Sequence, residues 1–166
     1  MTVAIDTNML LDIVLPDEKF VESSYELLAH YMKQGPLVIC DVVYAELATV
    51  FPDIGLVTRF LGDANITIAP TTPSALWFAS RAWGVYNSGR TKVLRCATCG
   101  FAQQYNCDKC GTVITSRQHM ISDFIIGAHA QENATRLLTR DRGFFTKYFP
   151  DLVTQASLYD RTSSPI

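Results

Sequence analysis

The sequence predicts an α/β sandwich with a mainly parallel central sheet. Short apolar runs that end in polar breaks alternate along the chain with longer segments of helical periodicity. None of the apolar runs alternates between apolar and polar residues, which is typical of strands buried on both faces of a parallel sheet. The length of 166 residues allows one domain, or one domain carrying a small insert.

Five apolar runs are expected to form the strands, at residues 3–5, 37–40, 66–69, 136–139 and 152–153. Helices are expected at residues 9–15, 17–33, 41–47, 53–61, 74–86, 117–133 and 144–148. Asp17 is in position to cap the second helix, and Thr72 followed by Pro73 is a typical helix start.

The composition excludes several classes of protein. Hydrophobic residues make up 48% of the chain, which excludes a disordered chain. No basic stretch precedes an apolar core at the start, where Asp6 interrupts the first ten residues, so no secretory signal is expected. The longest uncharged run, residues 64–80, contains Pro70 and Pro73 and is not a membrane span. We expect a cytoplasmic protein with no membrane partner.

A stretch rich in Cys, Gly, Thr and Gln interrupts the α/β pattern between two helices. We expect it to be an inserted mini-domain of residues 89–116. The main domain would then comprise residues 1–88 and 117–155, followed by a C-terminal tail of residues 156–166.

The insert contains two CxxC pairs, each followed by glycine: Cys96 with Cys99, and Cys107 with Cys110. Four thiolates at tetrahedral positions form a closed structural zinc site, and the glycines accept the left-handed backbone of such turns. Iron suits the same ligand set, while disulfides are disfavoured in a reducing compartment. We therefore expect a short zinc ribbon with one structural Zn²⁺.

The insert is weakly basic. Five bases and one acid lie between residues 90 and 119, and the Zn(Cys)₄ centre reduces this balance to about +2. Phe101 and Tyr105 could stack on nucleic-acid bases, but filling the small core of the ribbon is the favoured role for Phe101.

Four carboxylates lie in apolar sequence at positions where a parallel sheet would place a ligand site. Asp6 and Asp141 follow expected strands, and Glu46 and Asp123 lie early in expected helices. Carboxylates are rare in such surroundings unless they are paired or bind a metal. Since ligands bind beyond the carboxyl ends of parallel strands, hard divalent cations are the natural complement.

Four segments in order resemble the motifs of PIN-domain nucleases. Residues 3–11 (VAIDTNMLL) resemble their opening strand, and residues 43–47 (VYAEL) resemble their early-helix glutamate. Residues 121–130 (ISDFIIGAHA) resemble their central acidic helix, and residues 138–145 (LTRDRGFF) their closing motif. The resemblance covers about residues 1–155 apart from the cysteine insert. It is nearest to the VapC-like toxins, whose ordinary members lack a zinc insert.

The resemblance implies a PIN-like α/β/α sandwich that cleaves RNA with one or two Mg²⁺ or Mn²⁺ ions. The ions would be held by Asp6, Glu46, Asp123 and Asp141. Thr7, Asn8 and Thr139 are expected to orient these carboxylates or their waters, although Asn8 serves equally well as a helix cap. The candidate RNA contacts are Arg95, Arg117, His119, Arg140 and Arg142, with a solvated helix or turn as the alternative.

The first functional hypothesis is the endoribonuclease toxin of a toxin–antitoxin pair, with a small antitoxin partner and a homodimeric state. The second is an RNA-processing nuclease, similar to those of rRNA maturation, whose ribbon docks on RNA. The third is a non-catalytic RNA- or protein-binding module. A phosphatase is disfavoured because Asn8 lies where a second carboxylate would be needed.

The net charge of −2 says little about binding partners, because removing the four site acids leaves twelve acids against fourteen bases.

Two other residues have structural explanations. Asp12 is expected at the surface or in a turn, and Cys40 in the core.

Overall fold

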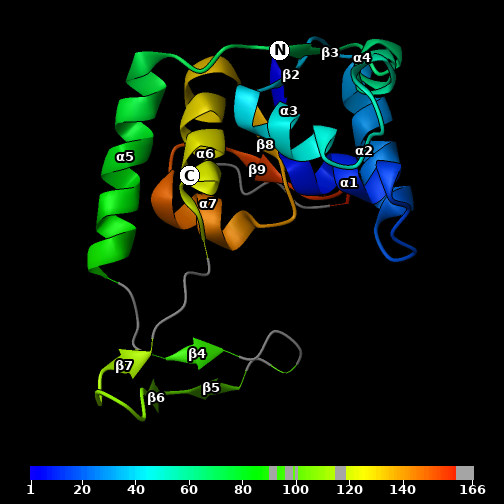
Figure 1. The fold of residues 1–166 in the computed structure, drawn as a ribbon. Helices are drawn as coiled ribbons and strands as arrows, with labels where there is room; N and C mark the ends of the chain where they lie inside the picture. The colour runs from blue at the N-terminus through cyan, green and yellow to red at the C-terminus, as the bar shows by residue number, and fades with distance from the viewer. Residues whose placement is uncertain (90–92, 96–98, 100, 115–118, 160–166) are drawn as a thin grey trace.

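The computed structural model describes residues 1–89, 93–95, 99, 101–114 and 119–159. A parallel sheet of five strands in the order β3-β2-β1-β8-β9 forms its centre and confirms the predicted fold class (Figure 1). The strands are β1 (Val3–Ile5), β2 (Leu37–Ile39), β3 (Ile66–Ile68), β8 (Arg136–Leu138) and β9 (Thr154–Gln155). Ala4 of the central strand is in register with Val38 on one side and Leu137 on the other.

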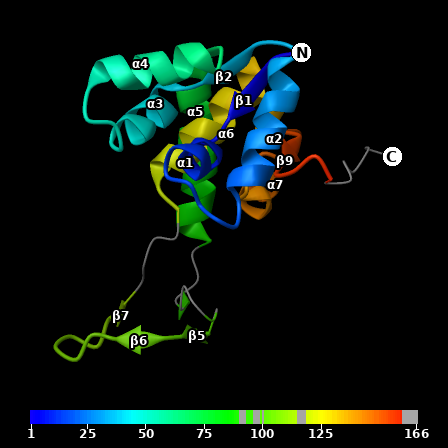
Figure 2. The ribbon, with the colours of Figure 1, turned by 90° about the vertical axis from the view of Figure 1, so that its right-hand side faces the viewer.

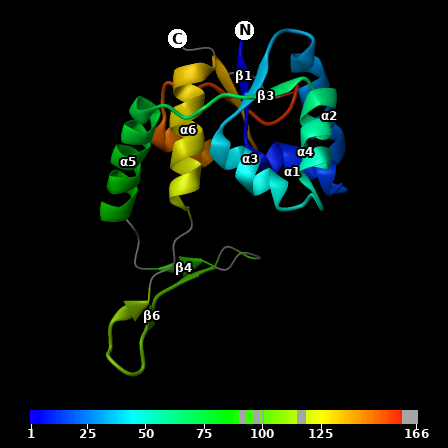
Figure 3. The same ribbon diagram turned by 45° about the horizontal axis from the view of Figure 1, so that its top comes forward.

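Helices cover the sheet. They are α1 (Thr7–Val14), α2 (Val21–Met32), α3 (Asp41–Ala48), α4 (Ile54–Asp63), α5 (Pro73–Ser88), α6 (Ile121–Asn133) and α7 (Arg142–Tyr148). The long helices α5 and α6 pack along each other at one side of the molecule, and α1, α2 and α4 lie at the other (Figures 1 and 3). No helix in the described ranges is both long and apolar enough to cross a bilayer.

Burial of short apolar strands on both faces produces the core. All three residues of β1 are buried, as are all three of β2, which explains why these runs show no alternation. Gly127 lets α6 approach the end of α7 closely, because a Cβ at this position would lie 2.3 Å from the ring of Phe149. Helix α6 and the end of α7 therefore lie in direct contact.

Several predicted boundaries are wrong. The last strand is β9 and not residues 152–153, because the Leu152 N–H donates to Phe149 in a turn (3.0 Å). Asp17 does not cap α2: its side chain accepts the Lys19 N–H, and the helix begins at Val21. The cap by Thr72 is confirmed, with its hydroxyl 3.1 Å from the Ala75 nitrogen.

The start of α6 also differs from the prediction. Residues 117 and 118 lie outside the described residues, and the helix begins at Ile121. Met120 is extended, with φ −104° and ψ 169°, so His119 precedes the helix instead of lying within it.

The cysteine-rich segment forms two small antiparallel strand pairs. Strand β4 (Leu94–Arg95) pairs with β5 (Ala102–Gln103), and β6 (Tyr105–Asn106) pairs with β7 (Val113–Ile114). Both pairs lie beyond the end of α5 and the start of α6, away from the central sheet (Figures 1 and 2). The predicted domain limits stay a prediction, and residues 160–166 of the tail lie outside the described residues.

Candidate active site

The carboxyl ends of the adjacent strands β1 and β8 bring Asp6 and Thr139 together. Asp6 follows β1, and its backbone N–H donates to the Leu138 carbonyl (2.9 Å). The Thr139 hydroxyl donates to Asp6 Oδ2 (2.7 Å), and both side chains are buried. Residues distant in sequence thus meet at the sheet edge where parallel α/β folds bind ligands.

Asn8 and Thr139 connect this point to the β8–α7 loop. Asn8 lies inside α1 and not at its cap, and its Nδ2 donates to Asp6 Oδ2. Its Oδ1 accepts the Arg140 N–H (3.2 Å), while Thr139 Oγ1 accepts the Asp141 N–H (3.0 Å). These bonds hold the Asp6 carboxylate and the loop before α7 in one network.

Glu46 reaches the same region from α3. The hydroxyl of Thr7, the first residue of α1, donates to Glu46 Oε2. The Glu46 side chain is half-buried. Thr7 therefore orients the second carboxylate, the role that the sequence predicts for it.

Asp123 and Asp141 lie at the starts of α6 and α7. Asp123 Oδ2 accepts the Met120 N–H (2.8 Å), and Asp141 Oδ1 accepts the Phe144 N–H (3.2 Å). Each acid therefore also stabilises a helix start, which is a structural reason for its presence. Asp141 is the more open of the two, with a side chain 49% exposed, unlike the buried Asp6.

Asp123 lies within electrostatic range of the other three carboxylates. Burial raises the pKa of Asp6 to about 7, and the negative charges of Asp123 and Glu46 add to this rise against the opposing hydrogen bonds from Thr139 and the Thr7 backbone. Burial also raises the pKa of Asp123, assisted by the charges of Glu46 and Asp141. The backbone N–H of Met120 and the nearby His119 oppose that rise.

The charge of this cluster fits a hard divalent cation. The imidazole of His119 lies near two of the acids, with its Nδ1 3.5 Å from Asp123 and 3.9 Å from Asp141. Carboxylate and hydroxyl oxygens are the ligands that Mg²⁺ prefers. No group of three His, Cys, Asp or Glu side chains in the described part of the chain forms a ready coordination shell. The oxygen atoms at this site are therefore of the type that binds Mg²⁺. Among the described residues, however, no three side chains are already placed to coordinate the ion together.

One expectation about the charged residues near the site is wrong. Asp12 is not a surface acid but 2% exposed, and its Oδ1 lies 2.9 Å from Nη2 of Arg140. The guanidinium of Arg140 is turned into the fold by this pair. Arg140 therefore has a structural role, and because its side chain is 32% exposed, its contact with RNA stays a prediction.

The other candidate RNA contacts are spread over the molecule. Arg142 is exposed at the first residue of α7, and Arg95 is the second residue of β4. His119 lies between Asp123 and Asp141. Arg117 lies outside the described residues.

The described cysteines, Cys40, Cys99, Cys107 and Cys110, are free thiols, and Cys40 is in the core as predicted. Cys96 lies outside the described residues.

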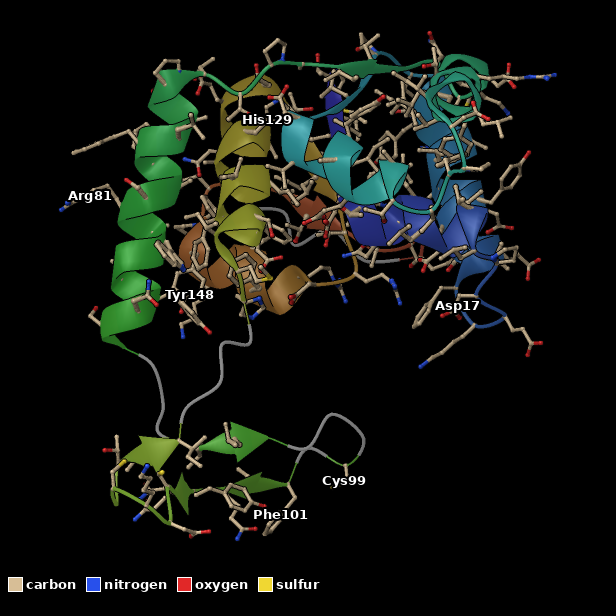
Figure 4. The ribbon with its side chains drawn as sticks, in the orientation of Figure 1. Asp17, Arg81, Cys99, Phe101, His129 and Tyr148 are labelled. Atoms are coloured by element: carbon tan, nitrogen blue, oxygen red, sulfur yellow. The ribbon has the colours of Figure 1, made fainter. Side chains whose placement is uncertain are left out.

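Cys107 and Cys110 form a tight turn that ends at Gly111. The Gly111 N–H donates to the Cys107 carbonyl (2.8 Å), and Gly111 has the predicted left-handed backbone, with φ 70°. Contact with Thr112, first through its hydroxyl, lowers the pKa of the Cys110 thiol. Cys99 lies on a separate loop of the insert (Figure 4) and joins no group of three metal-ligating side chains among the described residues.

The aromatic residues of the insert face solvent. Phe101 is 65% exposed and Tyr105 is 47% exposed, so the expectation that Phe101 fills a small core is wrong (Figure 4). The short strand pairs leave these rings available for contact with another molecule.

Comparison with known proteins shows the fold. No family model and no curated protein matches the sequence. VapBC2 from Rickettsia felis, bound to a DNA fragment from its promoter, matches with a TM-score of 0.56 and 17% identity, over 93% of this chain and 98% of that chain. VapBC-1 from nontypeable Haemophilus influenzae matches with a TM-score of 0.56 and 18% identity, over 93% and 97%. FitAcB from Neisseria gonorrhoeae matches with a TM-score of 0.56 and 13% identity, over 92% and 95%. The chain shares the PIN-like α/β fold of these structures.

Proposed function

We propose that this protein is a metal-dependent endoribonuclease that hydrolyses RNA phosphodiester bonds. The observation that carries the proposal is the convergence of four carboxylates from four segments of the chain at the carboxyl edge of the sheet. Hydrogen bonds from Thr7 and Thr139 orient two of them, Glu46 and Asp6. A divalent cation would balance the negative charge of carboxylates that lie this close together.

The residues of the chain divide into two roles. Asp6, Glu46, Asp123 and Asp141 would hold one or two Mg²⁺ or Mn²⁺ ions. Such an ion lowers the pKa of an attacking water and stabilises the charge that develops on the phosphate and the leaving oxygen. Thr7, Asn8 and Thr139 keep the carboxylates in place through the hydrogen bonds described above, so that little reorganisation is needed when substrate binds.

The biological role that we propose is the toxin of a toxin–antitoxin pair with a small antitoxin partner. The fold match to VapBC and FitAcB complexes supports this role. An RNA-processing role is the second candidate, and the exposed Phe101 and Tyr105 of the insert favour it. Mapping the 5′ and 3′ ends of cleaved total RNA separates the two: one recurrent site in translated RNAs favours a toxin, and one precursor end favours processing.

Zinc in the insert is part of the proposal. The turn from Cys107 to Cys110, with its left-handed Gly111, has the backbone of one zinc knuckle. Cys96 and Cys99 would supply the other two thiolates, which requires Cys99 to approach the Cys107–Cys110 pair. The metal would stabilise strand pairs that are too short to bury a core of their own.

We also propose a homodimer. Helix α5 exposes Trp77, Phe78 and Val85, each at least 60% exposed, outside the face that carries its buried residues Ala75 and Ala79. Apolar side chains grouped in this way are typical of interaction surfaces. Light scattering of the wild type and of Trp77→Glu tests the dimer, which the substitution should weaken.

The experiment that tests the nuclease compares Asp123→Asn with the wild type on single-stranded RNA in Mg²⁺ or Mn²⁺. Loss of cleavage with an unchanged melting temperature supports the proposal, because the amide keeps an acceptor for the Met120 N–H but lacks the negative charge. Asp63→Asn is the control, since Asp63 lies on exposed α4 in a surface ion pair with Arg59. Full activity of Asp123→Asn would overturn the proposed site.

A further inference from the structure

His119 lies between two carboxylates that belong to different helices. Its Nδ1 is 3.5 Å from Asp123 Oδ2 and 3.9 Å from Asp141 Oδ2. Both distances are longer than an ordinary hydrogen bond, so the imidazole faces both carboxylates without forming a short hydrogen bond to either. The same nitrogen can therefore donate to whichever oxygen turns toward it.

The His119 ring is held in this position by aromatic neighbours. It stacks on Phe144, with ring centroids 4.1 Å apart and an angle of 23° between the planes. The edge of the Tyr86 ring packs against it at 5.9 Å, and the His119 backbone N–H donates to the Tyr86 hydroxyl (3.3 Å). Since α5 and α7 both contact the residue, the imidazole has little freedom to leave the site.

Phe144 links the ring to the second acid. Its backbone N–H donates to Asp141 Oδ1 (3.2 Å), while its side chain supports His119, which faces Asp141 Oδ2. On the other side, the Met120 N–H donates to Asp123 Oδ2, the oxygen nearest to His119. The two carboxylates are thus each held by one backbone N–H and share one imidazole.

We infer that His119 is a positioning residue for the divalent cation, holding Asp123 and Asp141 together before the ion binds. The inference rests on the proposed function. Two neighbouring anions repel each other, and a donor placed between them offsets that repulsion and limits the orientations of both. Side chains that orient metal ligands in this way contribute ~10- to 100-fold to metal affinity or activity.

Two substitutions of His119 separate the effect of its N–H donor from the effect of its stacked ring. His119→Phe keeps a ring to stack on Phe144 but has no N–H, whereas His119→Asn keeps an N–H donor close to the Nδ1 position and loses the stacked ring. We expect Mn²⁺ binding to the RNA-free protein, followed by electron paramagnetic resonance at pH 7.5, to weaken ~10-fold or more in His119→Phe. His119→Asn should stay closer to the wild type.

Cleavage kinetics and melting temperatures complete the test. The inference predicts that His119→Phe needs more metal for half-maximal cleavage, with the KM for RNA unchanged at saturating metal. Unchanged Mn²⁺ affinity with a raised KM for RNA would make His119 a substrate contact and overturn the inference. Loss of Mn²⁺ binding in His119→Asn but not in His119→Phe would assign the effect to ring packing and overturn the inference too. A wild-type protein that binds no Mn²⁺ would overturn the proposed metal dependence as well, which distinguishes that failure from one specific to His119.

Discussion

Arg140 and Asp12 form an ion pair beside the candidate active site, with 2.9 Å between Nη2 and Oδ1. The Asp12 carboxylate also accepts the Ser24 hydroxyl (2.7 Å), and the Arg140 guanidinium lies 4.2 Å from the ring centroid of Phe20. The pair therefore ties α1 and α2 to the loop that joins β8 to α7. The Asp12 carboxylate is buried and the Arg140 side chain is 32% exposed, so the carboxylate depends most on the pair for its compensation.

Removing one member of this pair is expected to destabilise the fold. Asp12→Ala should lower the free energy of unfolding by ~1–3 kcal/mol, because the Ser24 hydroxyl loses its acceptor and the partly exposed Arg140 charge loses its carboxylate partner. Arg59→Ala, which breaks the exposed pair with Asp63, should cost ~1 kcal/mol or less. Urea denaturation measures both. Equal costs for the two variants would contradict the structural role of Arg140.

Thr139 is expected to be essential for activity although it is not a metal ligand. Its hydroxyl donates to Asp6 Oδ2 and accepts the Asp141 N–H, so Thr139→Val removes both bonds with little change in volume. We expect the rate of RNA cleavage to fall ~10- to 100-fold. Thr139→Ser keeps the hydroxyl and should retain most of the rate. A fully active Thr139→Val would show that the network does not orient the carboxylates.

Asp6 is expected to make the metal-free protein less stable as the pH rises. Its pKa is about 7 in the fold against an ordinary value of 3.8, so the folded state binds the proton more tightly than the unfolded state. This stabilisation is complete below pH 3.8 and is lost as the pH rises through about 7.

Asp6→Asn tests this pH dependence because its amide oxygen still accepts from Asn8 and Thr139 but does not ionise. In EDTA, its free energy of unfolding should exceed that of the wild type by an amount that grows from pH 4 to pH 8, up to ~4 kcal/mol. Added Mg²⁺ should reduce the difference at pH 8 by stabilising only the wild type. A difference that does not vary with pH would contradict the raised pKa.

The cysteine insert is expected to contain one zinc ion per chain. Elemental analysis of freshly purified, reduced protein should find this zinc, and Cys107→Ser should lose it. Cys40→Ala is the matched control, because Cys40 is buried in the core and should leave the zinc content unchanged. Strong chelation should remove the metal and disorder the insert. Protein with neither zinc nor iron would overturn the assignment.

Most of the fold could be predicted from local patterns. The runs at residues 3–5 and 37–39 are apolar at every position, and such runs form strands buried on both faces. Capping residues such as Thr72 act within a few positions of themselves, so their effect can be seen in the sequence. The predictions for Asp17 and for the last strand were wrong because a turn, closed by a hydrogen bond over two or three residues, forms where a helix cap or a strand was expected.

Local sequence patterns were enough to predict the α/β class, the strands at the centre of the sheet and the four acids expected at its edge. The surroundings of these acids became visible only in the folded chain: Asp6 is buried, Asp141 is open, Asp12 is paired with Arg140, and His119 lies between Asp123 and Asp141. The physical reason is distance along the chain. The residues that meet here come from strand ends and helix starts up to 133 positions apart, as for Thr139 and Asp6, and no local pattern records which of them come into contact.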